Sequence, residues 1–334
     1  MTQRRRALRW IALSTLLVVV FAACSEDKSD AGDGGSGASS DLSGEIVVDG
    51  SSTVAPLTSA AAEMFRAENP DVQIAVGTSG TGGGFQKFCA GETDMSNASR
   101  PIKDDDEGEG PACDTAGIKY EEIQVANDGL AIVVNLENDW AECLTVEQLK
   151  KMWEPAAQDT VTNWNQIDPS FPDEALTLYG AGTSSGTFDY FTDAINGEEG
   201  ASRSDYTQTE DDNTTVQGVS NGKGALGYFG LSYYEENQDK LKVVQVDDGD
   251  GCVEPTTETV QNGTYKPLSR PLFIYPNDAL LARPEGIAFV KFYVDNEDTI
   301  AKSALFVPLT DEQKQESISE VDALAETSKT SPSS

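Results

Sequence analysis

The chain has 334 residues and is strongly acidic, with 57 Asp and Glu against 23 Lys and Arg and a formal net charge of -34 at pH 7. This charge disfavours nucleic acid and anionic membrane surfaces as partners. Histidine is absent, which excludes Ser-His-Asp and Cys-His catalysis and removes the commonest zinc ligand. The length and the 38% of hydrophobic residues fit one two-lobed protein or two domains.

Residues 1–24 have the features of a lipoprotein signal peptide. A basic region from Arg4 to Arg6 precedes an apolar core that is too short for a membrane span. Small residues stand directly before Cys24, as in a bacterial lipobox, so we expect Cys24 to be the lipidated first residue of the mature chain; ordinary secretion is the alternative. Residues 25–43, rich in Ser, Asp, Gly and Ala, predict a flexible linker.

The sequence after residue 44 alternates predicted strands with predicted helices, which indicates an α/β protein with largely parallel sheets. The expected strands are 45–48, 72–76, 93–98, 118–126, 130–135, 175–179, 225–229, 241–246 and 271–275, and the expected helices include 57–65, 144–153, 188–195, 214–220, 232–237 and 284–294. Beyond residue 320 the sequence predicts a polar, frayed tail.

Three of these strands are followed by a loop rich in Gly, Ser and Thr that opens a helix, at residues 49–56, 77–84 and 180–187. The first N–H groups of a helix have no partner within it, and the helix dipole places partial positive charge there, so such a loop is suited to an anion. Ligands of parallel α/β sheets bind beyond the carboxyl ends of the strands. We therefore expect the three loops to converge on one small anion.

Other interpretations of single motifs are weaker. Residues 182–186 match the G-x-S-x-G nucleophile elbow, but no histidine is present to act as the base for Ser184. The acidic segment 104–109 is more typical of a solvated loop than of a calcium site, and Trp153 and Trp164 are more typical of a core than of sugar stacking. We predict a protein that is not an enzyme and has no metal and no cofactor.

Four cysteines remain besides Cys24, namely Cys89, Cys113, Cys143 and Cys252. An even number in an extracytoplasmic protein predicts two disulfides. On this argument alone the three connectivities stay open.

Five short motifs occur in an order that resembles the periplasmic phosphate-binding protein of the bacterial phosphate ABC transporter, over about residues 45–310. The motifs are Asp-Gly-Ser-Ser-Thr at 49–53, Gly-Thr-Gly-Gly-Gly-Phe at 80–85, Asn-Ala-Ser-Arg-Pro at 97–101, Ser-Gly-Thr at 185–187 and Gly-Ala-Leu-Gly-Tyr at 224–228.

The resemblance implies the two-lobed periplasmic-binding-protein fold of type 2, in which each lobe is a mostly parallel sheet flanked by helices and the ligand lies in the cleft. Lobe one would take residues 44–132 plus 257–320, lobe two residues 133–256, and residues 321–334 would form the polar tail. Because a disulfide across the lobes would oppose closure, the resemblance also implies the pairs Cys89–Cys113 and Cys143–Cys252.

The same resemblance implies a ligand set for phosphate: Ser52, Thr53, Val54, Ser79, Thr81, Ser99, Arg100, Ser185, Gly186 and Thr187. Three positions depart from the family. Where it carries an arginine and an aspartate shortly before the Ser-Gly-Thr motif, this chain has Ala181 and Thr183, and Ser99 stands near the position of a second aspartate.

These departures move the charges of the expected site. We expect Arg100 to supply the missing guanidinium as a bidentate donor. A carboxylate that accepts the proton of phosphate also rejects sulfate. Asp94, Asp211 or Asp212 are candidates to replace it; the alternative is a weaker selectivity, since a serine can accept this proton but rejects sulfate less firmly.

The expected function is therefore that of a binding protein that captures inorganic phosphate for the permease subunits of an ABC transporter. Sulfate or molybdate is the alternative ligand, and a secreted phosphatase-like protein on the same fold is the alternative class. The expected protein is a monomer outside the cytoplasm, lipid-anchored to the cell membrane or periplasmic.

Overall fold

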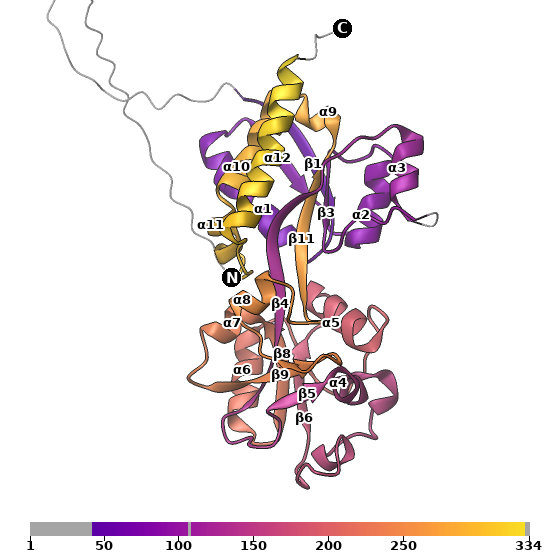
Figure 1. The fold of residues 1–334 in the computed structure, drawn as a ribbon, viewed down its shortest axis with the longest axis vertical. Helices are drawn as coiled ribbons and strands as arrows, with labels where there is room; N and C mark the ends of the chain where they lie inside the picture. The colour runs from indigo at the N-terminus through magenta and orange to yellow at the C-terminus, as the bar shows by residue number, and fades with distance from the viewer. Residues whose placement is uncertain (1–41, 106–107, 331–334) are drawn as a thin grey trace, which may run out of the picture. The chain divides into compact units, whose positions relative to one another are not determined.

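The computed structural model describes residues 42–105 and 108–330, with side-chain surroundings up to residue 323 (Figure 1). The strands of this part of the chain are β1 (Gly44–Gly50), β2 (Val72–Val76), β3 (Met95–Ala98), β4 (Ile123–Asn135), β5 (Cys143–Thr145), β6 (Thr177–Ala181), β7 (Thr207–Thr209), β8 (Ala225–Gly230), β9 (Leu241–Asp247), β10 (Cys252–Val253) and β11 (Ser269–Pro276). The α-helices are α1 (Ala55–Glu68), α2 (Gly80–Cys89), α3 (Gly110–Ala116), α4 (Val146–Trp153), α5 (Gly186–Asn196), α6 (Asp212–Asn221), α7 (Leu231–Glu235), α8 (Thr257–Gln261), α9 (Asp278–Leu281), α10 (Pro284–Asp295), α11 (Glu297–Ser303) and α12 (Asp311–Thr330). Two short 3-10 helices cover Pro155–Ala157 and Trp164–Gln166.

The first lobe is built on a sheet of order β2-β1-β3-β11-β4, in which β1 is parallel to β2 and β3 and β11 is antiparallel to β3 and β4. Neighbouring residues of a strand point to opposite faces. In β11, Leu272 packs in a cluster with helices α1 and α10, whereas Phe273 packs in a separate cluster with α2. Both faces of this sheet are therefore covered. The sheet is mixed and not mostly parallel as expected, since β11 is antiparallel to both of its neighbours.

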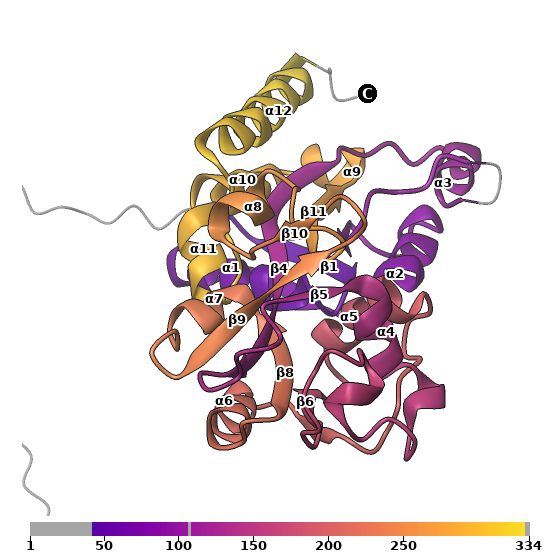
Figure 2. The same cartoon turned by 60° about the horizontal axis from the view of Figure 1, so that its bottom comes forward.

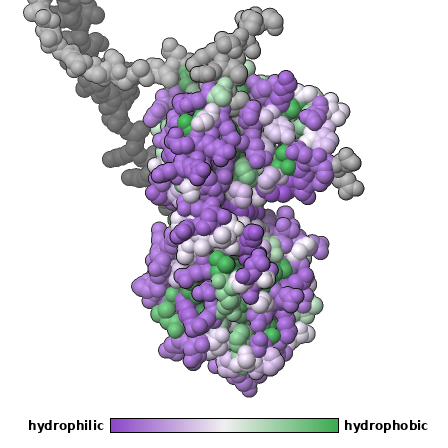
Figure 3. Space-filling model, viewed as in Figure 1, coloured by the Kyte–Doolittle hydropathy of each residue, from purple (hydrophilic) through white to green (hydrophobic). Residues whose placement is uncertain are grey.

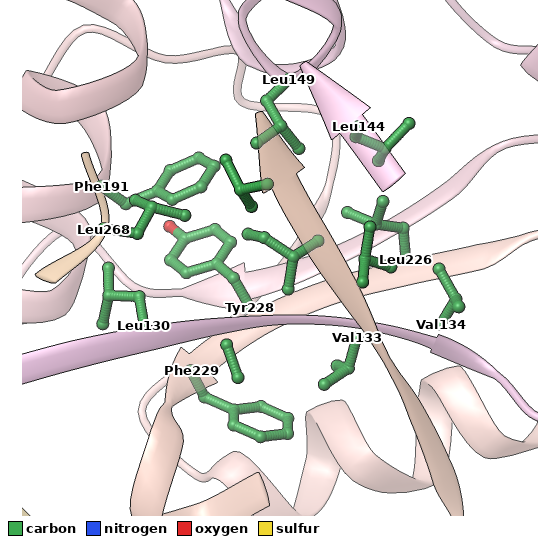
Figure 4. Packing of buried hydrophobic residues seen from close by; sticks show 14 of the residues in the cluster. Leu130, Val133, Val134, Leu144, Leu149, Phe191, Leu226, Tyr228, Phe229 and Leu268 are labelled. Atoms are coloured by element: carbon green, nitrogen blue, oxygen red, sulfur yellow. The ribbon is translucent and has the colours of Figure 1, made fainter. Parts of the chain in front are cut away.

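The second lobe is built on the order β4-β8-β6-β7, with β9 pairing to the second half of β4. Its core combines aliphatic side chains with the aromatic rings of Phe191 and Tyr228, which lie side by side in Figure 4. The Tyr228 ring of β8 stacks on Phe191 of α5 with a centroid distance of 3.8 Å, and Trp153 meets Tyr228 edge-on at 5.0 Å. Such pairs add to the free energy of area burial and fix the start of α5 relative to the sheet.

Strand β4 runs through both sheets, since its first half pairs with β11 and its residues from Leu130 onward pair with β8 and β9. β4 and β11 lie side by side where the two lobes join (Figures 1 and 2). Gly129 lies where the pairing of β4 passes from β11 to β8. A side chain would not fit there, because a Cβ would lie 2.5 Å from Cγ2 of Val260. The second half of the expected strand 118–126 and the expected strand 130–135 are thus parts of one continuous strand, Ile123–Asn135, and residues 118–122 lie before it.

The structure also shows with which lobe residues 257–268, which comprise α8 and the turn before β11, are packed. Val260, Tyr265 and Leu268 pack in the core of the second lobe. The resemblance assigned residues 257–268 to lobe one, whereas the side chains of this segment contribute to the second core.

The sequence predicted a loop over the whole glycine-rich stretch 77–84. The structure differs from this prediction, because helix α2 begins at Gly80. Each glycine costs a helix up to about 1 kcal/mol relative to alanine. Phe85 and Phe88 are fully buried, and burial of each contributes roughly 1.5–3 kcal/mol. Tertiary packing therefore outweighs the low helix propensity of the glycines.

The frayed tail predicted beyond residue 320 is also wrong for its first part, since α12 continues to Thr330. Val321 is 1% exposed and belongs to the first core. The Ser317 hydroxyl donates to the carbonyl of Gln124 at 2.9 Å, and Lys291 of α10 pairs with Asp322 at 3.0 Å. Figure 2 shows α12 beside α10 on the outside of the lobe. Within residues 311–323, the buried residues are Ser317 and Val321, one turn apart, and they hold a part of the helix that is otherwise polar.

Two disulfides join elements within a lobe. Cys89–Cys113 connects α2 to α3 in the first lobe, and Cys143–Cys252 connects β5 to β10, which both pair with β9 in the second. These are the two pairs that the resemblance implied. Neither bond restricts movement of one lobe against the other.

Hydrophilic residues cover most of the face seen in Figure 3. Within residues 42–105 and 108–330, no helix is long and apolar enough to cross a membrane. The expected signal peptide at 1–24, Cys24, and the linker up to residue 41 lie outside the described residues, as do residues 331–334 of the expected tail.

Candidate functional site

A small cavity of about 50 Å³ lies where the two lobes meet. Its walls come from the loop between β1 and α1, the first residues of α2, the loop after β3, the first two turns of α5 and strand β11. The lining residues are Ser51, Ser52, Thr53, Gly80, Thr81, Ser99, Gly186, Asp189, Tyr190, Asp193, Glu199 and Arg270. Three helices thus begin at one cavity.

The β1–α1 loop presents free donors to this cavity. The N–H of Ser51 donates to the carbonyl of Asn97 at 2.9 Å, which fixes the loop on β3. The helix has no side-chain cap at Val54. Among the described residues, the N–H groups of Ser52 and Thr53 donate to no protein acceptor. The start of α1 therefore offers two amides and two hydroxyls to a bound anion.

Helix α2 forms the second wall, and Asp49 fixes its start. The Ser79 N–H and hydroxyl both donate to Oδ1 of Asp49 at 2.8 Å, and Lys87 pairs with the same carboxylate. Although burial raises the pKa of Asp49, these hydrogen bonds outweigh it, and the pKa lies below its ordinary value. Ser79 is thus engaged with the protein, while the Thr81 hydroxyl lies 3.0 Å from that of Ser99 beside the cavity.

Helix α5 brings the second lobe against the β1–α1 loop. Its cap is Ser185, whose hydroxyl accepts from the N–H of Thr187 at 3.1 Å. A Cβ on Gly186 would lie 2.5 Å from Oγ1 of Thr53 and 2.9 Å from Oγ of Ser52. Only glycine allows the start of α5 to come this close to the donors of the first lobe.

Arg270 supplies the cationic group of the cavity. Its Nε donates to Oδ2 of Asp128 at 3.1 Å and its Nη2 donates to Oγ1 of Thr53 at 2.9 Å. The guanidinium lies over the ring of Tyr190 at 3.6 Å from the centroid. Burial raises the pKa of Asp128, and the charge of Arg270 opposes this rise. The guanidinium of Arg270 is thus held by Asp128 of β4, by Thr53 of the first lobe and by Tyr190 of the second. Its remaining N–H groups are available to an oxyanion.

Three carboxylates of the second lobe also line the cavity, Asp189 and Asp193 one turn apart on α5 and Glu199 in the loop that follows. Burial raises the pKa of Asp189, the charge of Glu199 raises it further, and Arg270 lowers it. A fully deprotonated oxyanion is disfavoured beside these groups, whereas an anion that carries a proton can donate it to a carboxylate.

Arg100 lies outside this cavity, on the wall of a larger one of about 730 Å³ that adjoins it. Its Nη2 donates to Oε1 of Glu109 at 2.6 Å, and its guanidinium lies 5.6 Å from the centroid of Phe85. Burial raises the pKa of Glu109, but the bonds from Arg100 and from the N–H of Lys103 keep it below its ordinary value. Arg100 is thus committed to an ion pair at the rim.

The carboxylates expected from the sequence are also elsewhere. Asp94 pairs with Arg283 at 2.7 Å. Asp211 caps helix α6, and Asp212 follows it in the first turn. None of the three lines the cavity.

The structure brings half of the expected ligand set together at the small cavity, namely Ser52, Thr53, Thr81, Ser99 and Gly186. Ser79 and Arg100 line the larger cavity with Thr81 and Ser99. Val54, Ser185 and Thr187 line neither cavity, and they adjoin Thr53 and Gly186 in the chain.

The acidic residues and Arg270 were missed by sequence reasoning. Asp189 and Asp193 carried a local signal, since they follow the Ser-Gly-Thr motif at the spacing of one helical face. Arg270 carried no local signal. It lies 83 residues beyond Thr187 and directly before the predicted strand 271–275. The order of strands in the sheet places it at the cavity.

Two α/β lobes joined by β4 and β11, with a small polar cavity between them, are the architecture of a two-lobed solute-binding protein. The profile of the PBP superfamily domain matches residues 35–297. The phosphate-binding protein PstS of Staphylococcus saprophyticus is 41% identical over 87% of this chain and 88% of that protein. The protein SphX of a Synechocystis strain is 44% identical over 92% of this chain and 87% of that protein. A crystal structure of a possible phosphate binding protein from Planctomyces limnophilus has a TM-score of 0.81 and 47% identity, over 85% of this chain and 99% of that chain. The chain therefore belongs to the PBP superfamily and, within it, to the family of the phosphate-binding proteins PstS.

Proposed function

We propose that this protein captures inorganic phosphate outside the cytoplasm and delivers it to the permease of an ABC-type transporter. One observation carries the proposal. The N-terminal ends of α1, α2 and α5 meet at a single small cavity together with the guanidinium of Arg270. Neutral amide and hydroxyl donors plus one arginine fork form a site for a tetrahedral oxyanion.

The size of the cavity supports a small ion. Its volume of about 50 Å³ is several times the roughly 10–15 Å³ that one water needs. Sites for sugars and drug-sized molecules are larger and mostly apolar. The net charge of -34 does not prevent binding, because charges beyond a Debye length of about 8 Å are largely screened at physiological salt.

The carboxylates favour phosphate over sulfate and molybdate. Phosphate keeps a proton near neutral pH and can donate it to Asp189, Asp193 or Glu199. Sulfate has no proton to donate, so its oxygens would face unpaired acceptors. A phosphatase-like reaction has no support from this site, since Ser51, Ser52 and Ser99 have no histidine to activate them.

The test of this proposal is calorimetry of the mature soluble chain with phosphate, sulfate and molybdate, together with a phosphate-ester hydrolysis assay. We expect tight phosphate binding, sulfate and molybdate at least about 100-fold weaker, and no hydrolysis. Absence of phosphate binding would refute the proposal. Hydrolysis of the ester would instead indicate a phosphatase-like enzyme.

The Asp189→Asn variant is expected to bind sulfate more tightly and to lose about tenfold of the phosphate-to-sulfate preference. The amide removes a charge and can donate to sulfate, whereas the carboxylate only accepts. Since the pKa of Asp189 is raised, sulfate binding by the natural protein should strengthen as pH falls through that pKa, and the variant should lose this contribution.

Competition calorimetry over a pH series that begins at the ordinary aspartate pKa of about 3.9 and rises to about pH 8 measures both effects. The matched control is Asp248→Asn, which changes an exposed carboxylate in the β9–β10 turn. An unchanged preference in Asp189→Asn would remove Asp189 from ligand discrimination.

The location and attachment of the protein belong to the same proposal. We place it at the outer surface of the cell membrane, anchored through lipid on Cys24, with the polar segment 25–43 as a tether. We also propose that the protein acts as a monomer. Replacement of Cys24 by serine should release the protein from membranes into the soluble fraction, and retention in the membrane would contradict the anchor.

A further inference from the structure

Arg270 is held by a partner that does not itself line the cavity. Asp128 and Arg270 stand directly opposite each other in the antiparallel pair of β4 and β11. This pair is next to Gly129, where β4 leaves the first sheet for the second. Any group that fixes the guanidinium here does so at the crossing between the lobes.

The contacts of Arg270 divide its donors into two sets. Asp128 occupies Nε at 3.1 Å, and Thr53 occupies one N–H of Nη2 at 2.9 Å. Among the described residues, Nη1 has no protein acceptor. With Nε–H given to Asp128 and one N–H of Nη2 given to Thr53, the second N–H of Nη2 and the two of Nη1 remain for a ligand in the cavity that Arg270 lines.

Burial makes this arrangement sensitive to the loss of Asp128. The Asp128 side chain is 5% exposed and that of Arg270 17%. An arginine side chain loses much conformational freedom when it is fixed, and a buried guanidinium without its carboxylate is strongly disfavoured. Tyr190 limits movement on one face only, through the ring contact and a hydrogen bond from its hydroxyl to the carbonyl of Pro267 at 2.8 Å.

We infer that Asp128 is a positioning residue for the site of the oxyanion. It acts only through Arg270, by holding Nε so that the free N–H groups of Nη1 and Nη2 are directed to the cavity. The inference rests on the proposed function. Asp128 does not line the cavity and is not a ligand. Its contribution to affinity is the orientation that Arg270 has before the anion arrives.

A second buried pair provides a matched control. Arg203 is 5% exposed and donates from Nε and Nη2 to Asp205 at 2.6 and 2.8 Å. It also donates to the carbonyls of Met152 and Val161, and neither Arg203 nor Asp205 lines the anion cavity. Asp205→Ala therefore removes the carboxylate partner of a buried arginine without touching the site.

The test is a double-mutant cycle of phosphate affinity on Asp128 and Arg270, with thermal unfolding measured in parallel. Asp128→Ala should weaken binding about tenfold or more, and Asp128→Asn should recover most of this loss because the amide oxygen still accepts from Nε. In the Arg270→Ala background, Asp128→Ala should change the affinity by less than about twofold. Asp205→Ala should lower the unfolding temperature and leave the affinity unchanged.

A further tenfold loss on adding Asp128→Ala to Arg270→Ala would overturn the inference, since Asp128 would then act without Arg270. The same holds if the asparagine variant binds as weakly as the alanine variant. If Asp128→Ala does not fold as a single variant, the double variant of Asp128 and Arg270 can be used, because it leaves neither charge without its partner. Its phosphate affinity compared with that of Arg270→Ala then tests the inference. Failure of the natural protein to bind phosphate is a separate result that refutes the proposed function instead.

Discussion

Replacement of Arg270 by alanine is expected to weaken phosphate binding about 100-fold. The guanidinium lines the cavity and is the cationic group that faces it from within the described residues. Its Nε bond to Asp128, its bond to Thr53 and its stacking on Tyr190 leave the other N–H groups set for an oxyanion. The loss exceeds that of an exposed ion pair, because the charge acts at a partly buried site where screening by water is weak.

Titration calorimetry of three variants measures this effect. Arg270→Lys keeps the charge but loses the planar fork, so we expect an intermediate loss of about tenfold. Arg100→Ala is the matched control, since Arg100 is paired with Glu109 at the rim, and its removal should change the affinity by no more than about threefold. A larger loss in Arg100→Ala than in Arg270→Ala would return the cationic role to the residue that the sequence suggested.

The contrast between these two arginines shows what local sequence can predict about the site. Arg100 belongs to a short motif next to a ligand loop, so the motif alone favoured it. Nothing in the sequence reports that Glu109 folds back onto it. Arg270 reaches the cavity because β11 lies between β3 and β4, and this placement is a property of the strand order. Loop residues were predictable from composition, whereas the charges depended on tertiary contacts.

The fold shows the same division. Strand β2 was expected at 72–76 and lies at Val72–Val76, because its apolar residues and flanking breaks are local signals. Helix α2 was shortened in the prediction because glycine has low helix propensity, and helix α12 was missed because its sequence is polar. In both cases a few buried side chains, such as Phe85 and Val321, decide the conformation. Packing of this kind is not visible in a window of sequence.

The second large effect is expected from Gly186→Ala, which should abolish measurable phosphate binding or weaken it by at least about 100-fold. The new Cβ would lie 2.5 Å from Oγ1 and 2.8 Å from the backbone nitrogen of Thr53, and 2.9 Å from Oγ of Ser52. It would therefore occupy space beside the hydroxyl and amide donors of the first lobe and force α5 away from them. A displacement of about 1 Å at such a site is enough for a loss of this size.

Stability should respond in the opposite direction. Alanine is favoured over glycine in a helix by up to about 1 kcal/mol, and the lobes can separate slightly to relieve the clash. The variant should thus unfold at the same temperature as the natural protein or slightly higher, while calorimetry shows the loss of binding. Gly222→Ala is the matched control in the same lobe, because the nearest atoms to its Cβ would be the Ala225 Cβ at 3.3 Å and two backbone atoms at 3.7 and 3.9 Å. Phosphate binding by Gly186→Ala at the natural affinity would mean that the start of α5 does not contact the bound anion, and the site would have to be redrawn around the first lobe and Arg270 alone.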